Sequence, residues 1–244
     1  QSKEKMKHLR DADGNWLGPG NVRIRFKQKD QVRSGPLTIG YTGYGGSSHI
    51  GPELQFGFVV GEHFKDREVL LIKTAWGGKS LHKDFRPPGS DGETGEYYTR
   101  MVEEIRAGLE ELPSGSYELK GFVWMQGWND MVSKEATEEY AGNLVNLAAD
   151  LREEFGFPWA EFIVGELGNG GEAKAGSGMA KFRKAQKEGV EKIEKAWFTR
   201  TSEFARPPEL SPNTSHGHHW FGNAESYFLI GDALGRDMIR ALNR

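Results

Sequence analysis

The stretch GFVWMQGWND, residues 121–130, begins as an apolar strand and runs directly into two amides and a carboxylate. A continuous apolar strand is typical of a parallel sheet covered on both faces. In such sheets, ligands gather beyond the carboxyl ends of the strands, where the polar residues after Met125 would lie. The stretch therefore predicts an α/β fold with functional groups at one rim of its sheet.

Apolar strands and amphipathic helices alternate along the rest of the chain. Further strands are expected at 69–75, 162–166 and 196–199. Helices are expected from Pro52 onward and over about 95–112, 134–155, 179–194 and 224–242. Strands that alternate with helices of this length indicate βαβ units around a mostly parallel sheet. We therefore predict one domain over 1–244 with three α/β/α layers.

The first part of the chain has a different character. Residues 1–35 are polar and glycine-rich, and they predict an irregular region or a hairpin. Within them, 22–26 alternates apolar and charged residues, as an exposed strand or hairpin arm does. A short strand is expected at 36–40.

Composition excludes several classes of function. The 244 residues include 32 basic and 35 acidic ones, for a net charge of −3, which argues against a nucleic-acid or membrane surface. No apolar run approaches the roughly 20 residues that span a bilayer. The absence of cysteine excludes disulfides, thiolate metal sites and thiol catalysis. No signal peptide is recognisable at the start of the sequence. Whether an upstream segment has been cleaved or left out is an open alternative.

Two of the predicted strands end in groups suited to stabilise an anion. Gly77 and Gly78 follow the 69–75 strand, and their backbone N–H groups could face a developing negative charge. From this dipeptide alone, a plain turn is the better interpretation. Asn129 could donate its amide to an oxyanion, and Asp130 could orient a histidine. A helix cap or Asx-turn is an equally good account of these two residues.

A histidine cluster, SHGHHW at 215–220, precedes the last predicted helix. His216, His218 and His219 could bind a metal through their imidazoles, or one of them could be a general base. A structural loop is the third alternative. Because no carboxylate lies at ligand spacing, we expect no metal and no cofactor.

The chain resembles carbohydrate esterases of the SGNH-hydrolase superfamily, in the sialate O-acetylesterase-like group. The resemblance rests on GPELQFG (51–57), LLIKTAWGGKSL (70–81), GFVWMQGWNDM (121–131), FIVGELG (162–168) and HHWFGNAESYFLIGDALG (218–235). It implies a flavodoxin-like α/β/α fold, an acylated carbohydrate as substrate, and deacetylation by a serine and a histidine. It also implies that His219 is the base, and that Asn129 and Gly77 or Gly78 form the oxyanion hole. Substrate contacts are expected from Gly77, Gln126, Trp128 and Trp76.

This sequence departs from the family pattern in two ways. The Gly-Gln-Ser-Asn motif that carries the nucleophile at the end of the first strand is missing, and we interpret the chain as lacking that strand as well. Ser47, Ser48 and Ser80 are weak substitutes, because none directly follows a buried strand. The acid that often precedes the histidine by three residues is replaced by His216. Asp130 is the best remaining acid, followed by Glu166.

The missing strand would lie between the 69–75 and 121–126 strands in the family order. Three outcomes are open: the 36–40 strand fills the gap, a partner copy or an N-terminal fragment supplies a strand, or the two flanking strands pair directly. We favour a strand supplied from elsewhere. The rival to an active esterase is a truncated, inactive relative that still binds sugars through Trp76, Trp128 and Trp220.

Overall fold

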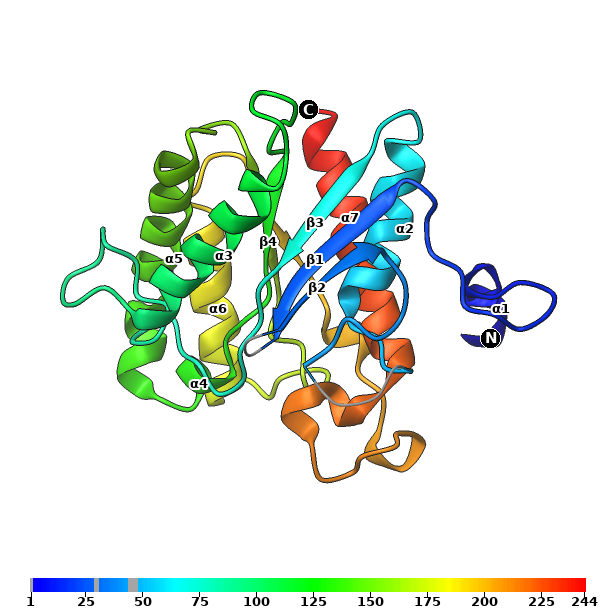
Figure 1. Cartoon of the computed structure of the whole chain (residues 1–244). Coiled ribbons are helices and arrows are strands. Elements are labelled where there is room, and N and C mark those ends of the chain that lie inside the picture. Colours follow the sequence, from blue (N-terminus) through cyan, green and yellow to red (C-terminus); the bar gives the residue numbers. More distant parts are fainter. Residues whose placement is uncertain (1, 29–30, 44–47) are drawn as a thin grey trace.

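The computed structural model describes residues 2–28, 31–43 and 48–244 as an α/β fold (Figure 1). The strands are β1 (Val22–Gln28), β2 (Gln31–Pro36), β3 (Val69–Lys73), β4 (Gly121–Trp124), β5 (Glu161–Gly165) and β6 (Ala196–Thr199). The main helices are α2 (Pro52–His63), α3 (Glu96–Glu110), α5 (Lys134–Phe155), α6 (Gly178–Val190) and α7 (Ala224–Leu242). Shorter helical turns are α1 (Ser2–Lys5), α4 (Trp128–Met131), η1 (Lys7–Leu9), η2 (Ser202–Phe204), η3 (Pro208–Leu210) and η4 (Gly217–Gly222).

The strands form two three-stranded sheets instead of one. The first has the order β2-β1-β3, with β2 antiparallel and β3 parallel to β1. The second has the order β4-β5-β6 and is entirely parallel. In the described part of the chain, β3 pairs only with β1 and β4 only with β5. The facing edges of β3 and β4 therefore have no strand partner.

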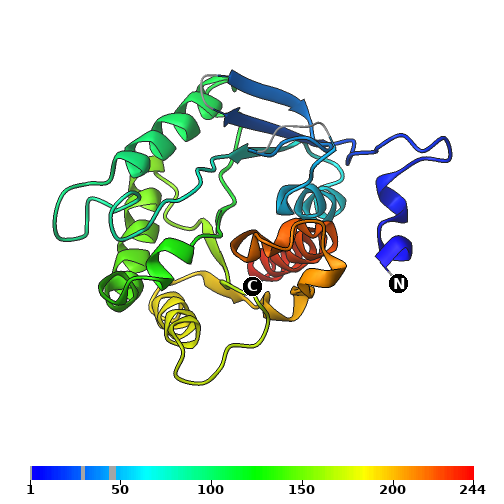
Figure 2. The same ribbon diagram turned by 90° about the horizontal axis from the view of Figure 1, so that it is seen from below.

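Two helical layers hold the half-sheets together, and Figure 2 shows them on opposite sides of the strands. On one side, α2 and α7 lie against each other so closely that a Cβ at Gly231 would meet the Pro52 carbonyl oxygen at 2.2 Å. On the other side, a single apolar cluster joins Ile72 of β3 to Trp124 of β4 and to residues of α3 and α5. The helices thus span a gap that the strands do not close.

The strands that border this gap are less buried than their sequences predict. All five residues of β3 are only half-buried, although four are Val, Leu or Ile. Val123 in β4 is 40% exposed. By contrast, every residue of β5, which has a neighbour on each side, is buried. The apolar β3 and β4 sequences suit a strand with two neighbours, and each has only one.

Local sequence signals explain where the long helices begin and end. Ser133 caps α5 by accepting a hydrogen bond from the Ala136 N–H, and Gly156 ends the helix with a left-handed φ of 68°. Asn223 caps α7 in the same way through the Ser226 N–H. The predicted bounds of both helices are confirmed.

The N-terminal predictions need correction. The predicted hairpin is present as β1 and β2, but β1 is not exposed: Val22, Ile24 and Phe26 are buried because β1 is the middle strand of the first sheet. The predicted 36–40 strand is wrong, since β2 ends at Pro36 on the outer edge and 37–40 forms no strand. It does not fill the gap, and 69–75 and 121–126 do not pair with each other.

We predict that hydrogen exchange will separate these strands. The gap-facing amides of β3 and β4 lack a backbone acceptor in the described chain, so they should exchange on the timescale of exposed loops. The amides of β5 should exchange many times more slowly, because each has a ladder partner. Exchange measured by NMR checks this, with Phe162–Val164 as the internal control. Equal protection in all three strands would contradict the open gap.

Candidate active site

The chain turns sharply at Gly127 after β4, at the carboxyl end of the second sheet. Gly127 has φ 156°, and a Cβ there would meet the Phe182 ring at 2.4 Å, so no other residue fits without rearrangement. The turn leads directly into α4, which carries Trp128, Asn129 and Asp130. Asn129 is half-buried, and no hydrogen bond occupies its amide among the described residues. Its donor is free to meet a ligand.

Asp130 is fully buried and fastens the loop that follows β3. One carboxylate oxygen accepts from the Leu81 N–H at 2.9 Å, and the other from the His82 N–H at 2.9 Å. Gln126 Nε2 adds a third bond at 2.6 Å. Burial raises the pKa of Asp130, while these three donors pull it back toward the ionised form. Asp130 is therefore used within this loop and is not bonded to the histidine cluster.

The loop that Asp130 fastens presents two glycines to solvent. Gly78 has a left-handed φ of 69°, and no atom lies within 4 Å of where a Cβ would stand on Gly77 or Gly78. Among the described residues, neither glycine N–H has a backbone acceptor. The loop thus offers exposed N–H donors on one side of the gap, while Asn129 offers its amide on the other.

Gln126 also helps to hold the glycine loop against α4. Its Nε2 donates to the Lys79 carbonyl at 2.9 Å as well as to Asp130. The Tyr140 hydroxyl, fully buried, donates to the Gln126 carbonyl at 3.1 Å. Gln126 was expected to contact substrate, but its amide is committed to holding the glycine loop against α4.

The histidine cluster lies at the start of η4, with His216 just before it and His218 and His219 inside it, and a strained backbone follows. Trp220 and Phe221, directly after His219, both have left-handed φ values of 54° and 53°, which are uncommon for bulky residues. Phe221 N–H bonds the His216 carbonyl at 3.0 Å, and Trp220 is buried. Strained backbone of this kind persists only where the surrounding contacts hold it in place.

Two residues that the sequence did not single out hold this loop. Asn169 Nδ2 donates to the carbonyls of Gly217 at 3.3 Å and His218 at 3.0 Å. The Tyr227 hydroxyl donates to the His219 carbonyl at 3.0 Å. Asn169 lies in a glycine-rich loop after β5. A polar residue just beyond the carboxyl end of a strand is the sequence feature that could have identified it.

The structure brings the histidines next to α4. The Trp128 and His218 rings lie 5.7 Å apart, and the His218 and His219 rings 4.4 Å apart. Asn129 and His219 directly follow Trp128 and His218 in sequence, so the segments that carry them lie side by side although they are 90 positions apart. Burial, together with the charges of His218 and His216, lowers the pKa of His219. The environment of His219 thus favours the neutral imidazole over the charged form.

Three other residues considered in the sequence, Glu166, Trp76 and Trp220, have structural contacts instead. Glu166 is buried and accepts from the N–H groups of Thr201 at 2.9 Å and Ser202 at 2.8 Å. Trp76 packs its ring 5.5 Å from that of Tyr97 and joins the core cluster. Trp220, expected at a sugar-binding rim, is core instead.

The three candidate serines differ in their positions. The Ser80 hydroxyl is engaged by Asp84 at 3.0 Å and by the Lys83 N–H at 3.1 Å. Ser48 is exposed, and Ser47 lies outside the described residues. Within the described ranges, no group of His, Asp and Glu side chains could hold a metal ion. No helix there is long and apolar enough to cross a membrane.

The fold and the rim together define a class of protein. The α/β fold, with its two small sheets between helical layers, matches the structures of SGNH-like esterases. The chain belongs to the carbohydrate esterase family of sialic acid-specific acetylesterases, whose model matches residues 20–239. It is thus a member of a family of carbohydrate acetylesterases.

Solved structures share this fold at low sequence identity. A protein from Arabidopsis thaliana superposes with a TM-score of 0.66 at 20% identity, covering 93% of this chain and 88% of its own. A carbohydrate acetylesterase from Xanthomonas citri gives 0.56 at 15% identity, covering 96% of this chain and 51% of its own. A search of curated proteins found no match.

Replacing Asp130 should loosen the glycine loop. Asp130→Ala leaves the Leu81 and His82 N–H groups buried without an acceptor, which we expect to lower the free energy of unfolding by roughly 2–4 kcal/mol. Asp130→Asn, which keeps one acceptor, should cost less. Denaturant unfolding measures both, with the exposed Glu103→Ala as the control. A loss no larger than that of the control would mean that water replaces the carboxylate.

The pKa of His219 can be measured directly. Its ring should titrate below the ordinary value of 6.5, because burial and two neighbouring imidazoles disfavour the charged form. With a pKa lowered on folding, the group stabilises the fold above 6.5 and loses that contribution as the pH falls. NMR titration of the ring protons, identified by their loss in His219→Gln, gives the midpoint. A midpoint at or above 6.5 would contradict the expected environment.

Proposed function

We propose that the protein removes O-acetyl or other short acyl groups from carbohydrates by a Ser-His mechanism. The proposal rests mainly on Asp130, a buried residue that holds two sets of hydrogen-bond donors near each other. Asp130 holds the loop with the free N–H groups of Gly77 and Gly78, and it is adjacent in α4 to the free amide of Asn129. Family membership supplies the chemistry that such donors would serve.

In the proposed reaction, a serine hydroxyl attacks the acyl carbonyl carbon while His219 takes its proton. The carbonyl oxygen becomes an oxyanion, stabilised by the Gly78 N–H and the Asn129 amide. Collapse of this intermediate releases the sugar hydroxyl, to which His219 returns the proton, and leaves an acyl-serine. Water then repeats the same steps to release the acid.

The glycine loop is attached to β3 and Asn129 to β4, so the two donors stand at the carboxyl ends of the strands bordering the gap. An extended segment filling the gap parallel to both strands would end between them. Its first residue past the strand would lie where an attacking hydroxyl is needed. We propose that such a segment carries the serine, from an N-terminal fragment or from a neighbouring copy in a homo-oligomer.

Trp128 and Trp76 differ in how directly they could contact the substrate. Trp128 is half-buried beside His218, so its face can stack on a sugar ring next to the acyl site. Trp76 is packed against Tyr97 and Phe85, and it would contribute mainly by backing the glycine loop. Gly77, which is open to solvent, can approach the substrate through its backbone.

The alternative is an inactive relative that binds sugars without cleaving them. One observation favours it: the Ser80 hydroxyl, nearest to the glycine loop, is already bonded to Asp84 and Lys83. In that alternative, the donors would hold a carboxylate or a sugar, and no ester would be cleaved.

A labelling experiment separates these possibilities. Hydrolysis of p-nitrophenyl acetate is measured for residues 1–244 alone and for the polypeptide extended by the residues encoded upstream. A serine-directed phosphonate is then applied, and peptide mapping locates the labelled residue. We expect labelling and activity only in the extended protein. Labelling within 1–244 would place the nucleophile in this chain, and inactivity of both forms would favour the binding-only alternative.

Asn129→Ala should reduce kcat by roughly 100-fold or more in the active form, because it removes one oxyanion donor. KM and the unfolding midpoint should change little, since the Asn129 amide bonds no described residue. Asn146→Ala in α5, whose amide donates to Ser90 at 3.0 Å, is the control for losing a surface amide. An unchanged kcat would reduce Asn129 to a turn residue.

A further inference from the structure

A second hollow lies at the opposite ends of the strands, away from Asn129 and His219. It encloses about 230 Å³ beside Lys120, Glu161 and Lys195, which lie at or just before the starts of β4, β5 and β6. This volume is below the ~300–1,000 Å³ of sites for drug-sized ligands and suits a single small ring. The candidate active site lies at the carboxyl ends of the same strands, so the two places are distinct.

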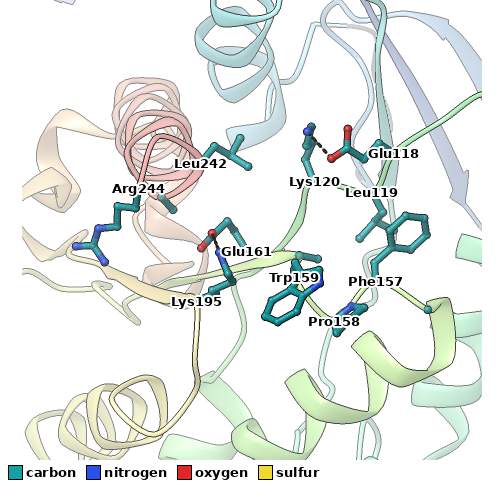
Figure 3. Close-up of a pocket in the computed structure, with 13 residues that line it drawn as sticks. Glu118, Leu119, Lys120, Phe157, Pro158, Trp159, Glu161, Lys195, Leu242 and Arg244 are labelled. Atoms are coloured by element: carbon teal, nitrogen blue, oxygen red, sulfur yellow. Dashed lines mark hydrogen bonds and ion pairs between the residues drawn. The ribbon is translucent and has the colours of Figure 1, made fainter.

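An aromatic side chain forms one wall of this hollow. Trp159 is 70% exposed, and Figure 3 shows its indole projecting among the lining residues next to Pro158. Phe157 stands beside it, with its ring 6.2 Å from that of the partly exposed Tyr117. An exposed indole that faces a hollow offers a flat apolar surface on which a ring can stack.

A carboxylate from a largely buried side chain opens onto the hollow. The Glu161 side chain is 7% exposed, and its nearest cation, Lys195 Nζ, is 3.6 Å away, beyond good hydrogen-bonding distance. Arg152 lies close, but its guanidinium donates to the carbonyls of Ala160, Glu194 and Lys195. The carboxylate therefore forms an ion pair with Lys195 but no described hydrogen bond, and its oxygens are open to solvent at the hollow instead of being sealed in the core. A ligand hydroxyl could donate to them.

The charges around the hollow are already matched. Lys120 pairs with Glu118 at 2.6 Å, and Lys195 pairs with Glu161. Arg244 stacks on the Trp197 ring at 3.9 Å. A free anion would find no unpaired lysine here, whereas a neutral ligand with several hydroxyls could donate to Glu161 and accept from the lysines.

We propose that this hollow is a second, non-catalytic binding site for a neutral sugar ring. The ring stacks on Trp159, one hydroxyl donates to Glu161, and neighbouring hydroxyls accept from Lys120 or Lys195. This inference rests on the chemistry of the hollow itself and goes beyond the proposed esterase function. Its role is to retain a carbohydrate on the protein, at a place where no acyl transfer occurs.

The test uses the 244-residue chain with methyl β-D-glucopyranoside, methyl β-D-galactopyranoside and methyl β-D-xylopyranoside as neutral probes. The protein has seven tryptophans, so NMR resolves up to seven indole N–H signals, and Trp159→Ala identifies one of them. We expect the Trp159 signal to move with a Kd on the order of 1 mM for at least one glycoside. Inorganic phosphate should leave it in place.

Variants locate the binding. Trp159→Ala should weaken it at least about tenfold, and Glu161→Gln several-fold with the unfolding midpoint recorded alongside. Trp16→Ala, which removes a partly exposed indole far from the hollow, should bind as the unaltered protein does. Asn129→Ala should also bind normally, so a failure of the esterase proposal leaves this result unaffected.

Three results would overturn the proposal. One is the absence of any Trp159 shift up to about 100 mM glycoside, far above the affinity expected of a sugar site. Another is binding that moves only the Trp128 signal and survives Trp159→Ala, which would place all sugar at the carboxyl ends of the strands. The third is self-association abolished by Trp159→Ala without any sugar effect, which would make the indole a protein contact.

Discussion

The unpaired edges of β3 and β4 are the constraint on which the rest of this structure depends. A buried strand edge carries a row of N–H and C=O groups whose partners are normally another strand. Here the two half-sheets are held at a distance by α2 with α7 on one side and by the α3–α5 cluster on the other. The helices thus hold β3 and β4 in one fold without pairing them, and the β3 residues, which have a strand neighbour on one side only, are half-buried.

The same gap explains why Asp130 matters. Among the described residues, no backbone hydrogen bond joins the loop after β3 to the turn after β4, so their relative position depends on side chains. Asp130 and Gln126 supply that link through bonds to Lys79, Leu81 and His82. Because Asn129 is the next residue in α4, one short helix sets both the amide and the glycine N–H groups. A carboxylate considered as a brace for a histidine instead holds the loop of Gly77 and Gly78 against α4.

The sequence allowed the elements to be predicted where local signals are strong. Helix α5 has a Ser cap, helix α7 has an Asn cap, and both have a long apolar stripe. The predicted ends of these two helices were correct. The burial of β1 was missed, because its alternating arginines resemble an exposed strand. Arg25 is buried only because Glu104 and Glu111 of the α3 region neutralise it, at 3.2 and 2.7 Å. Such long-range pairs leave no local trace, and neither do the bonds of Asp130.

The length of a carbohydrate decides whether it can contact both ends of the strands. A strand such as β5, with five residues, is about 16 Å long at ~3.3 Å per residue, so one sugar ring cannot reach both Trp159 and Asn129. A small ester would meet only the carboxyl ends, whereas a long glycan could engage both places. Binding at the far end would then raise the local concentration of acyl groups without orienting any of them. Loss of Trp159 should accordingly weaken the retention of polymers and leave the turnover of small esters unchanged.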